Sequence, residues 1–208
     1  MNRRILVILP ALLLTACGRQ EPAEPSKTAP KQAPETCRVA FDTTKGVFVV
    51  EVTRAWAPRG ADRFYELVLK KFYDGARFYR VVPRFVVQFG LKGDPASDRY
   101  WSTMYIPDDP VTQNNKRGSL SFAMAGAATR TTQVFINLAD NFRLDGMGFA
   151  PFAKVVSGME VVDQLFKGYG DAPPSGVGPE QNRVREEGNE YLERYFPRLD
   201  YIKTARIQ

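Results

Sequence analysis

The chain contains no histidine among its 208 residues. Catalytic arrangements of the Ser-His-Asp and Cys-His kinds use an imidazole as the base, so neither can be built from this sequence. Zinc sites that include histidine are excluded for the same reason. Any catalysis by this chain therefore has to work without an imidazole.

Phosphate- and dinucleotide-binding loops are missing as well. The run GYGDAPPSGVGPE, residues 168–180, is rich in glycine. A nucleotide-binding glycine loop follows a strand and opens a helix with fixed glycine spacing, and this run has neither feature. It is typical of a long loop. We predict no cofactor and no metal ion.

The sequence also has no concentrated run of basic residues. Lysine and arginine total 29 against 23 acidic residues, a formal net charge of +6. The basic residues are scattered and mixed with acids, as in residues 183–187, whereas a nucleic-acid-binding face needs them clustered. We predict no nucleic-acid partner.

The apolar run near the N-terminus, Ile5–Leu14, is short and is interrupted by Pro10. It cannot span a bilayer as a permanent helix. It follows Arg3 and Arg4, and this order of a basic segment and a short apolar segment is that of an export signal. We interpret residues 1–16 as a signal peptide.

Cysteine is scarce, with Cys17 and Cys37 the only two. The first ends the run LTAC, residues 14–17, which resembles the lipobox of bacterial lipoproteins. The resemblance implies that Cys17 is lipidated and anchors the chain to a bacterial membrane, facing the periplasm. Gly18 in place of aspartate favours the outer membrane. The alternative is an ordinary signal peptide followed by a chance cysteine.

The residues after this cysteine divide into two parts. Residues 17–36 are rich in Pro, Ala, Glu and Lys and have no apolar periodicity, so we predict a flexible tether. Residues 37–208 are predicted to form one folded domain, with residues 167–198 as an extra loop and helix. If Cys17 carries lipid, Cys37 is left without a partner for an intrachain disulfide.

Short strands dominate the predicted domain. A hairpin is expected over 37–53, and helical spacing of apolar residues over 58–75 and 158–166. A charged extra helix is expected over 182–196, and residues 92–117 are predicted to be irregular. Single strands are expected at 78–82, 85–89, 119–124, 134–138, 149–156 and 199–207. This pattern predicts a mainly β fold: a closed, eight-stranded antiparallel barrel capped by two helices, plus the extra C-terminal helix.

Two polar residues interrupt the strands of the run FYRVVPRFVVQFG, residues 78–90. Arg80 and Gln88 lie among residues that otherwise favour burial. A strand that only packs a core needs neither side chain, so we interpret them as candidate functional residues.

Two further runs complete a pattern with this one. They are SFAMAGAATRTTQVFINL, residues 121–138, and RLDGMGFAPFAKVVSGMEVVD, residues 143–163. In this order and spacing, the three runs resemble the signature segments of cyclophilin-type peptidyl-prolyl cis-trans isomerases. The resemblance covers most of residues 37–166. It implies a cyclophilin-like barrel that isomerises X-Pro bonds, here in exported proline-containing polypeptides.

The reaction explains why an arginine suits such a site. Rotation of an X-Pro amide crosses a barrier of about 18–20 kcal/mol because resonance is broken. In the twisted transition state the prolyl nitrogen becomes a hydrogen-bond acceptor, and a guanidinium is a fixed, charged donor. By resemblance, Arg80 is this donor and Gln88 holds the substrate backbone. The resemblance assigns substrate binding to Phe85, Val86, Ala123, Met124, Ala125, Gln133, Phe135 and Leu144.

Some positions depart from the family pattern. Tyr79 stands where histidine is common, Arg143 stands where many members have tryptophan, and Gly148 replaces a bulky histidine near the proline slot. Phe89 replaces a glycine. These departures leave a second hypothesis open, a catalytically weak peptide-binding module or holdase chaperone. A structural lipoprotein that has kept only the fold is a third.

Overall fold

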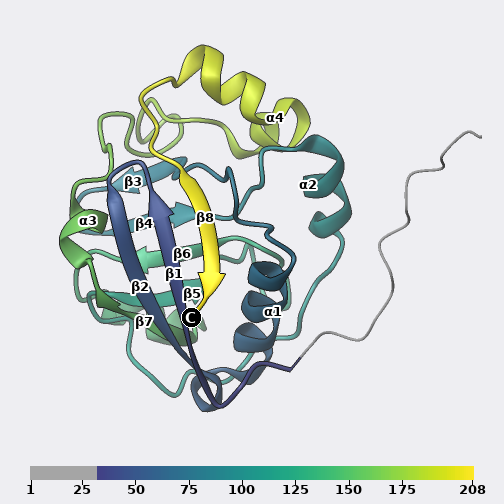
Figure 1. Cartoon of the computed structure of the whole chain (residues 1–208), viewed down its shortest axis with the longest axis vertical. Coiled ribbons are helices and arrows are strands. Elements are labelled where there is room, and N and C mark those ends of the chain that lie inside the picture. Colours follow the sequence, from purple (N-terminus) through teal and green to yellow (C-terminus); the bar gives the residue numbers. More distant parts are fainter. Residues whose placement is uncertain (1–31) are drawn as a thin grey trace, which may run out of the picture.

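The computed structural model describes residues 32–208 (Figure 1). The predicted signal peptide, Cys17 and most of the predicted tether lie outside these residues. Of residues 32–36, predicted as part of the tether, Ala33 packs on the domain and Thr36 pairs with Thr53 in the sheet. Ala33 is buried and its backbone N–H donates to Asp62 Oδ1 at 2.9 Å. The ordered domain therefore begins slightly before Cys37.

All eight expected strands are present, and they form one antiparallel sheet. The order across the sheet is β3-β4-β6-β5-β7-β2-β1-β8. The strands are β1 (Thr36–Thr43), β2 (Gly46–Thr53), β3 (Arg80–Val82), β4 (Val86–Phe89), β5 (Ser119–Phe122), β6 (Val134–Asn137), β7 (Pro151–Ser157) and β8 (Ile202–Ile207).

The prediction of a closed barrel is wrong, because the sheet is an open, curled half-barrel. Its edges are β3 and β8. The chain just before each edge strand makes one isolated bridge, between Arg77 and Tyr201. Beyond this bridge β3 pairs only with β4, and β8 pairs only with β1. No ladder of hydrogen bonds therefore forms between the two edge strands. Closure of a barrel needs such a ladder.

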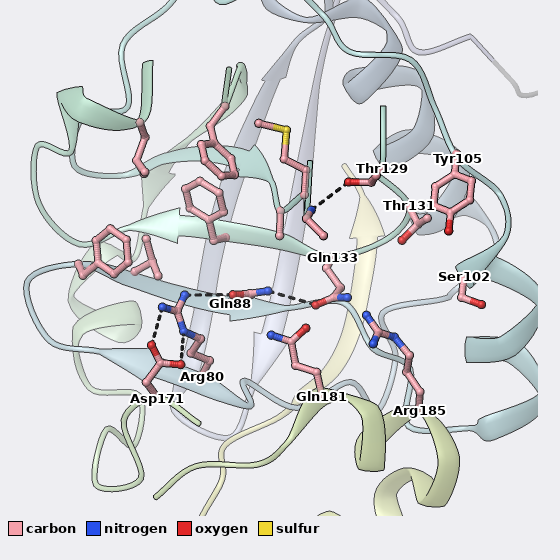
Figure 2. Close-up of a pocket in the computed structure, with 18 of the residues that line it drawn as sticks. Arg80, Gln88, Ser102, Tyr105, Thr129, Thr131, Gln133, Asp171, Gln181 and Arg185 are labelled. Carbon is pink, nitrogen blue, oxygen red and sulfur yellow. Dashed lines mark hydrogen bonds and ion pairs between the residues drawn. The ribbon is translucent and has the colours of Figure 1, made fainter. Parts of the chain in front are cut away.

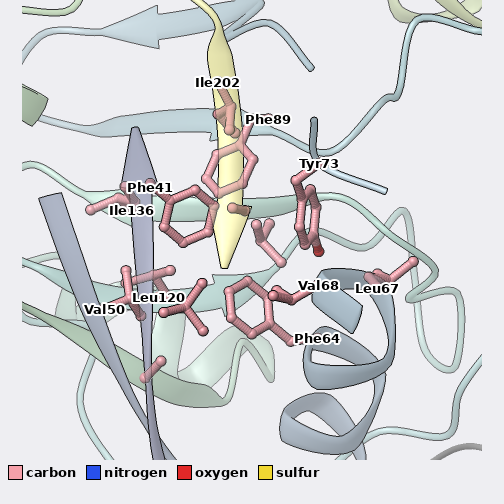
Figure 3. Close-up of a cluster of buried hydrophobic side chains, with 14 of the residues drawn as sticks. Phe41, Val50, Phe64, Leu67, Val68, Tyr73, Phe89, Leu120, Ile136 and Ile202 are labelled. Atoms are coloured by element: carbon pink, nitrogen blue, oxygen red, sulfur yellow. The ribbon is translucent and has the colours of Figure 1, made fainter. Parts of the chain in front are cut away.

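The main core lies against the concave sheet and is rich in aromatic side chains (Figure 3). The helix α1 (Pro58–Leu69) contributes Phe64, which lies 6.2 Å from Phe41 between ring centroids. Tyr73 and Phe89 meet edge to face at 5.5 Å. Edge-to-face pairs of this kind add to the stabilisation from buried area.

Side chains of β4 alternate between this core and the opposite face of the strand. Val87 and Phe89 belong to the main core, whereas Val86 belongs to a separate small cluster. Gln88 lies on the same face as Val86, because successive side chains of a strand point to opposite faces. This alternation places Gln88 outside the main core. It also directs the large ring of Phe89 into the main core, on the face of β4 opposite Gln88.

The helices follow the prediction in part. The extra helix α4 (Gln181–Tyr195) is present and is interrupted at Gly188, and α3 (Met159–Asp163) is short. The structure adds α2 (Pro95–Ser102) within the segment predicted to be irregular, and two 3-10 turns, Arg54–Trp56 and Phe142–Met147. In Figure 1, α1 and α2 lie on one side of the sheet and α4 lies beyond one end of it. Of the helices in residues 32–208, none is both long and apolar enough to cross a membrane.

The missed helix α2 carried a local signal. Asp94 is its N-cap, and the Asp94 side chain accepts a hydrogen bond from the Ser97 backbone N–H at 3.0 Å. Pro95 follows at the first helical position, where its missing N–H costs nothing. An aspartate followed by proline is therefore a start signal that apolar periodicity alone does not detect.

Candidate active site

All ten residues predicted for catalysis and substrate binding line one pocket of about 750 Å³. The pocket opens on the face of the sheet that carries Gln88 (Figure 2). The predicted residues are Arg80, Phe85, Val86, Gln88, Ala123, Met124, Ala125, Gln133, Phe135 and Leu144. The structure thus brings together residues that lie up to 64 positions apart in the chain, counting from Arg80 to Leu144.

Strand register aligns three of these residues in a row. Arg80 on β3 is paired with Gln88 on β4, and Gln88 is paired with Phe135 on β6. Directly paired residues of neighbouring strands share one face of the sheet and contact each other. The guanidinium, the amide and the aromatic ring therefore lie side by side because of backbone pairing alone.

The guanidinium of Arg80 is held on two sides. Its Nε and Nη2 donate to Asp171 Oδ1 and Oδ2 at 2.8 and 2.7 Å, and its Nη1 donates to Gln88 Oε1 at 3.2 Å. Paired bonds between a guanidinium and a carboxylate fix the plane of the guanidinium. Bonding to Arg80 lowers the pKa of Asp171 below its usual range, so this carboxylate stays ionised at neutral pH.

A second chain of hydrogen bonds fixes Gln88 from the other side. Gln88 Nε2 donates to Gln133 Oε1 at 3.1 Å, and the buried hydroxyl of Tyr79 donates to the same oxygen. Burial raises the pKa of Tyr79, so the phenol remains a neutral donor. Tyr79 is one of the departures from the family pattern, and here it holds the amide row in place.

The apolar part of the pocket is a cluster separate from the main core. Val86, Phe135 and Leu144 are buried, and Phe85, Ala123 and Phe149 pack against them. Phe149 was not predicted. Its ring meets that of Phe135 edge to face at 5.6 Å. We call these six residues the proline slot.

Two departures from the family pattern lie beside this slot. A Cβ placed on Gly148 would lie 3.4 Å from the ε-methyl of Met124, so the methionine covers part of the space beside this glycine. The guanidinium of Arg143 lies over the Phe85 ring, 5.0 Å from its centroid, and that of Arg80 lies 5.5 Å from the same centroid. Phe85 is thus contacted by two cations, which favours a fixed ring position.

Sequence reasoning missed nine of the residues that line the pocket. Asp171, Gln181 and Arg185 come from the extra loop and helix, to which the family resemblance assigned no purpose. The remaining unpredicted lining residues are Ser102, Thr103, Tyr105, Thr129, Thr131 and Phe149. Thr129, Thr131 and Phe149 lie within the signature runs, but the resemblance gave them no role in the site. The other unpredicted residues lie outside these runs, and their approach to the site depends on the path of distant segments.

Comparison with known proteins shows the family of the chain. Residues 38–185 match the family model "Cyclophilin type peptidyl-prolyl cis-trans isomerase/CLD". The chain is 37% identical over 161 residues to peptidyl-prolyl cis-trans isomerase-like 1 of Aspergillus oryzae, covering 73% of this chain and 98% of the relative. It is 34% identical to peptidyl-prolyl cis-trans isomerase A of Dickeya dadantii, covering 88% of this chain and 92% of that one.

Solved structures show the same fold. A cyclophilin type peptidyl-prolyl cis-trans isomerase of Cryptosporidium parvum superposes with a TM-score of 0.62 at 21% identity, covering 83% of this chain and 98% of that chain. A second structure of that protein, determined in the presence of the dipeptide Ala-Pro, gives a TM-score of 0.60 over 82% of this chain.

Proposed function

The chain belongs to the cyclophilin-type peptidyl-prolyl cis-trans isomerases, and we propose that Arg80 and the proline slot perform this isomerisation on exported polypeptides. The observation that carries the proposal is the position of Arg80. Its guanidinium is fixed by Asp171 and Gln88 next to the apolar proline slot, in a pocket of about 750 Å³.

The mechanism follows from what each group can bind. The proline ring packs in the slot, which grips one side of the X-Pro bond. As the amide twists, the prolyl nitrogen loses its resonance and gains an accessible lone pair, and the N–H groups of Arg80 that are not bound to Asp171 or Gln88 can donate to it. This bond forms in the twisted state and hardly at all in the planar one, as catalysis requires. No proton is transferred at any step.

Gln88 has two roles in this account. Its Oε1 accepts from Arg80 and its Nε2 donates to Gln133, so it links the guanidinium to the rest of the row. The second hydrogen of Nε2 remains for a substrate carbonyl. That bond would hold the polypeptide backbone while the amide rotates.

A catalytically weak peptide-binding module remains the second candidate. The observation that favours it is the pair of hydrogen bonds between Arg80 and Asp171. These bonds already occupy two of the N–H groups that Arg80 could offer to the prolyl nitrogen. A protease-coupled assay with an X-Pro peptide separates the two candidates. An isomerase raises the rate of the slow phase of cleavage, which is limited by cis-trans isomerisation. A binding module leaves that rate unchanged and only reduces the amount of peptide available for cleavage.

We expect kcat/KM to be flat between about pH 7 and 8, because the proposed mechanism uses a guanidinium, which stays charged, and amide groups, which do not titrate. The pKa of Asp171 is lowered by Arg80, and burial raises the pKa values of Tyr79 and of the free thiol of Cys37. Burial also raises the pKa of Asp98 to about 6. Protonated Asp98 therefore stabilises the folded state at low pH, and this stabilisation is lost as the pH rises through about 6. That change is complete below the pH window of the activity measurement.

The measurement is kcat/KM for a peptide without ionising side chains, with circular dichroism as a check that the fold is unchanged. A limb of the profile inside the window would show that an acid or base takes part. The hydrogen-bonding mechanism would then be wrong or incomplete.

The proposed anchor gives a separate expectation. Cys17→Ser should release the protein from membranes or leave it as an uncleaved precursor, because the thiol that accepts the lipid is gone. Cys37→Ser is the matched control, since Cys37 lies in β1 of the folded domain, and it should fractionate as the natural chain does. Membrane fractionation and gel mobility measure both. A Cys17→Ser variant that behaves like the natural chain would refute the lipid anchor.

A further inference from the structure

The end of the pocket formed by α2 and α4 is lined by polar side chains and has no assigned role. Gln181 and Arg185 lie four residues apart on α4, and both side chains point into the pocket near Gln133 (Figure 2). We call this region the polar end. Its lining residues are Ser102, Thr103, Thr129, Thr131, Gln181 and Arg185.

Arg185 brings an unneutralised positive charge to the polar end. Its one hydrogen bond is from Nη1 to Asn182 Oδ1 at 2.9 Å, and within residues 32–208 no carboxylate lies within 4.0 Å of its guanidinium. Three charged residues line the pocket, namely Arg80, Asp171 and Arg185. Because Asp171 is paired with Arg80, the excess charge of the pocket is positive and lies at Arg185.

Asp98, a nearby acidic residue, forms no ion pair with Arg185. Its two carboxylate oxygens accept from the backbone N–H groups of Lys92 at 2.7 Å and Gly93 at 2.9 Å. Arg185 acts on Asp98 only through space, as a minor lowering of a pKa that burial raises. The guanidinium of Arg185 therefore keeps donors free for a ligand.

The position of Arg185 is fixed by the packing of its helix. Val184, the preceding residue, is fully buried in a cluster with Tyr79. One turn later α4 lies close to the backbone of Gly93. Gly188 has φ +67°, and a Cβ there would lie 2.5 Å from the Gly93 carbonyl oxygen. The Asn189 backbone N–H donates to that same oxygen at 2.8 Å. The helix is thus held against the segment before α2, with Arg185 directed at the pocket.

We propose that Arg185, with Gln181 beside it, forms a subsite for a carboxylate side chain of the substrate. A guanidinium binds a carboxylate through paired hydrogen bonds and charge. The inference rests on the proposed function, because a polypeptide with its proline in the slot would extend a flanking residue past Gln88 and Gln133 towards Arg185. The chain then prefers X-Pro substrates that carry Asp or Glu close to the proline.

Matched peptides test this subsite directly. Each peptide has one X-Pro bond and a single Glu or Gln, placed in turn at each of the three positions before the proline and the two after it. Affinity is measured by calorimetry, and isomerisation by exchange NMR, with the full chain. At one of these positions we expect Glu to be favoured over Gln by about fivefold, and this ratio should fall towards one in high salt.

Substitutions on α4 assign the preference. Arg185→Gln should reduce the Glu-to-Gln ratio to about one, and Arg185→Glu should favour Lys at the same position. Arg183→Gln is the matched control. Arg183 lies on the same helix but pairs with Glu187 at 2.6 Å and does not line the pocket, so its loss should leave the ratio unchanged.

The outcomes separate this inference from the proposed function. Equal binding and turnover of Glu and Gln peptides at all five positions overturns the subsite and leaves the isomerase intact. A Glu preference that survives Arg185→Gln also overturns it. If no peptide is isomerised faster, the proposed function fails, and the Glu-to-Gln affinity ratio still decides the subsite.

Discussion

Arg80→Ala is expected to lower kcat/KM for an X-Pro peptide by about a hundredfold, equivalent to about 3 kcal/mol of transition-state stabilisation. The loss follows from removing the charged donor that lines the pocket and that Asp171 and Gln88 hold beside the proline slot. Peptide affinity should change much less, because the slot itself is intact. Exchange NMR gives the rate and calorimetry gives the affinity.

Arg84→Ala is the matched control for this substitution. Arg84 carries the same charge in the turn between β3 and β4, is exposed, and does not line the pocket. Its loss should leave kcat/KM within about twofold, since an exposed charge that does not line the pocket contributes little. An Arg80→Ala protein that folds normally and turns over peptide like the natural chain would contradict the mechanism and favour the binding module.

Gly90→Ala is expected to destabilise the folded state by about 3 kcal/mol or more. Gly90 follows β4 and has φ +106°, a conformation that side chains rarely adopt. A Cβ there would also lie 2.5 Å from the Thr132 carbonyl oxygen and 2.8 Å from the Gln133 Cα. These are backbone atoms that cannot rotate away, so the chain leading into β6 must shift.

Gly75→Ala separates the clash from the backbone conformation. Gly75 has φ +81°, and no atom lies within 4 Å of a Cβ placed there, so only the cost of positive φ applies, about 1–2 kcal/mol. Urea unfolding of both variants measures the difference. Gly90→Ala should also impair turnover, since Gln133 moves with the backbone. Equal losses of stability in the two variants would show that the close approach of β4 to this segment is not rigid.

Arg80 and Gln88 could be predicted as candidate site residues from local features of the sequence, whereas Phe135 was predicted through the resemblance to the family. Strand alternation puts Val86 and Gln88 on one face of β4, and the short connection between β3 and β4 brings Arg80 beside Gln88. Phe135 reaches Gln88 through the long-range pairing of β4 with β6. A polar residue in an apolar strand is visible in the sequence itself. The same reasoning predicted the eight strands and the extra helix α4.

The features that escaped prediction depend on long-range placement. Asp171 and Arg185 reach the pocket because a loop and a helix fold back over the sheet edge, and nothing in their local sequence encodes that path. The open sheet was missed for a similar reason. Strand number alone cannot show that β3 and β8 separate after one bridge at Arg77.

The most direct test of the central claim is exchange NMR on an Ala-Pro-containing peptide with a catalytic amount of the full chain. Uncatalysed exchange takes tens to hundreds of seconds. We predict that the natural chain makes the cis and trans signals exchange far faster, and that the Arg80→Ala chain loses most of this acceleration while still binding the peptide. Binding of peptide by the natural chain with no gain in exchange rate would contradict the account.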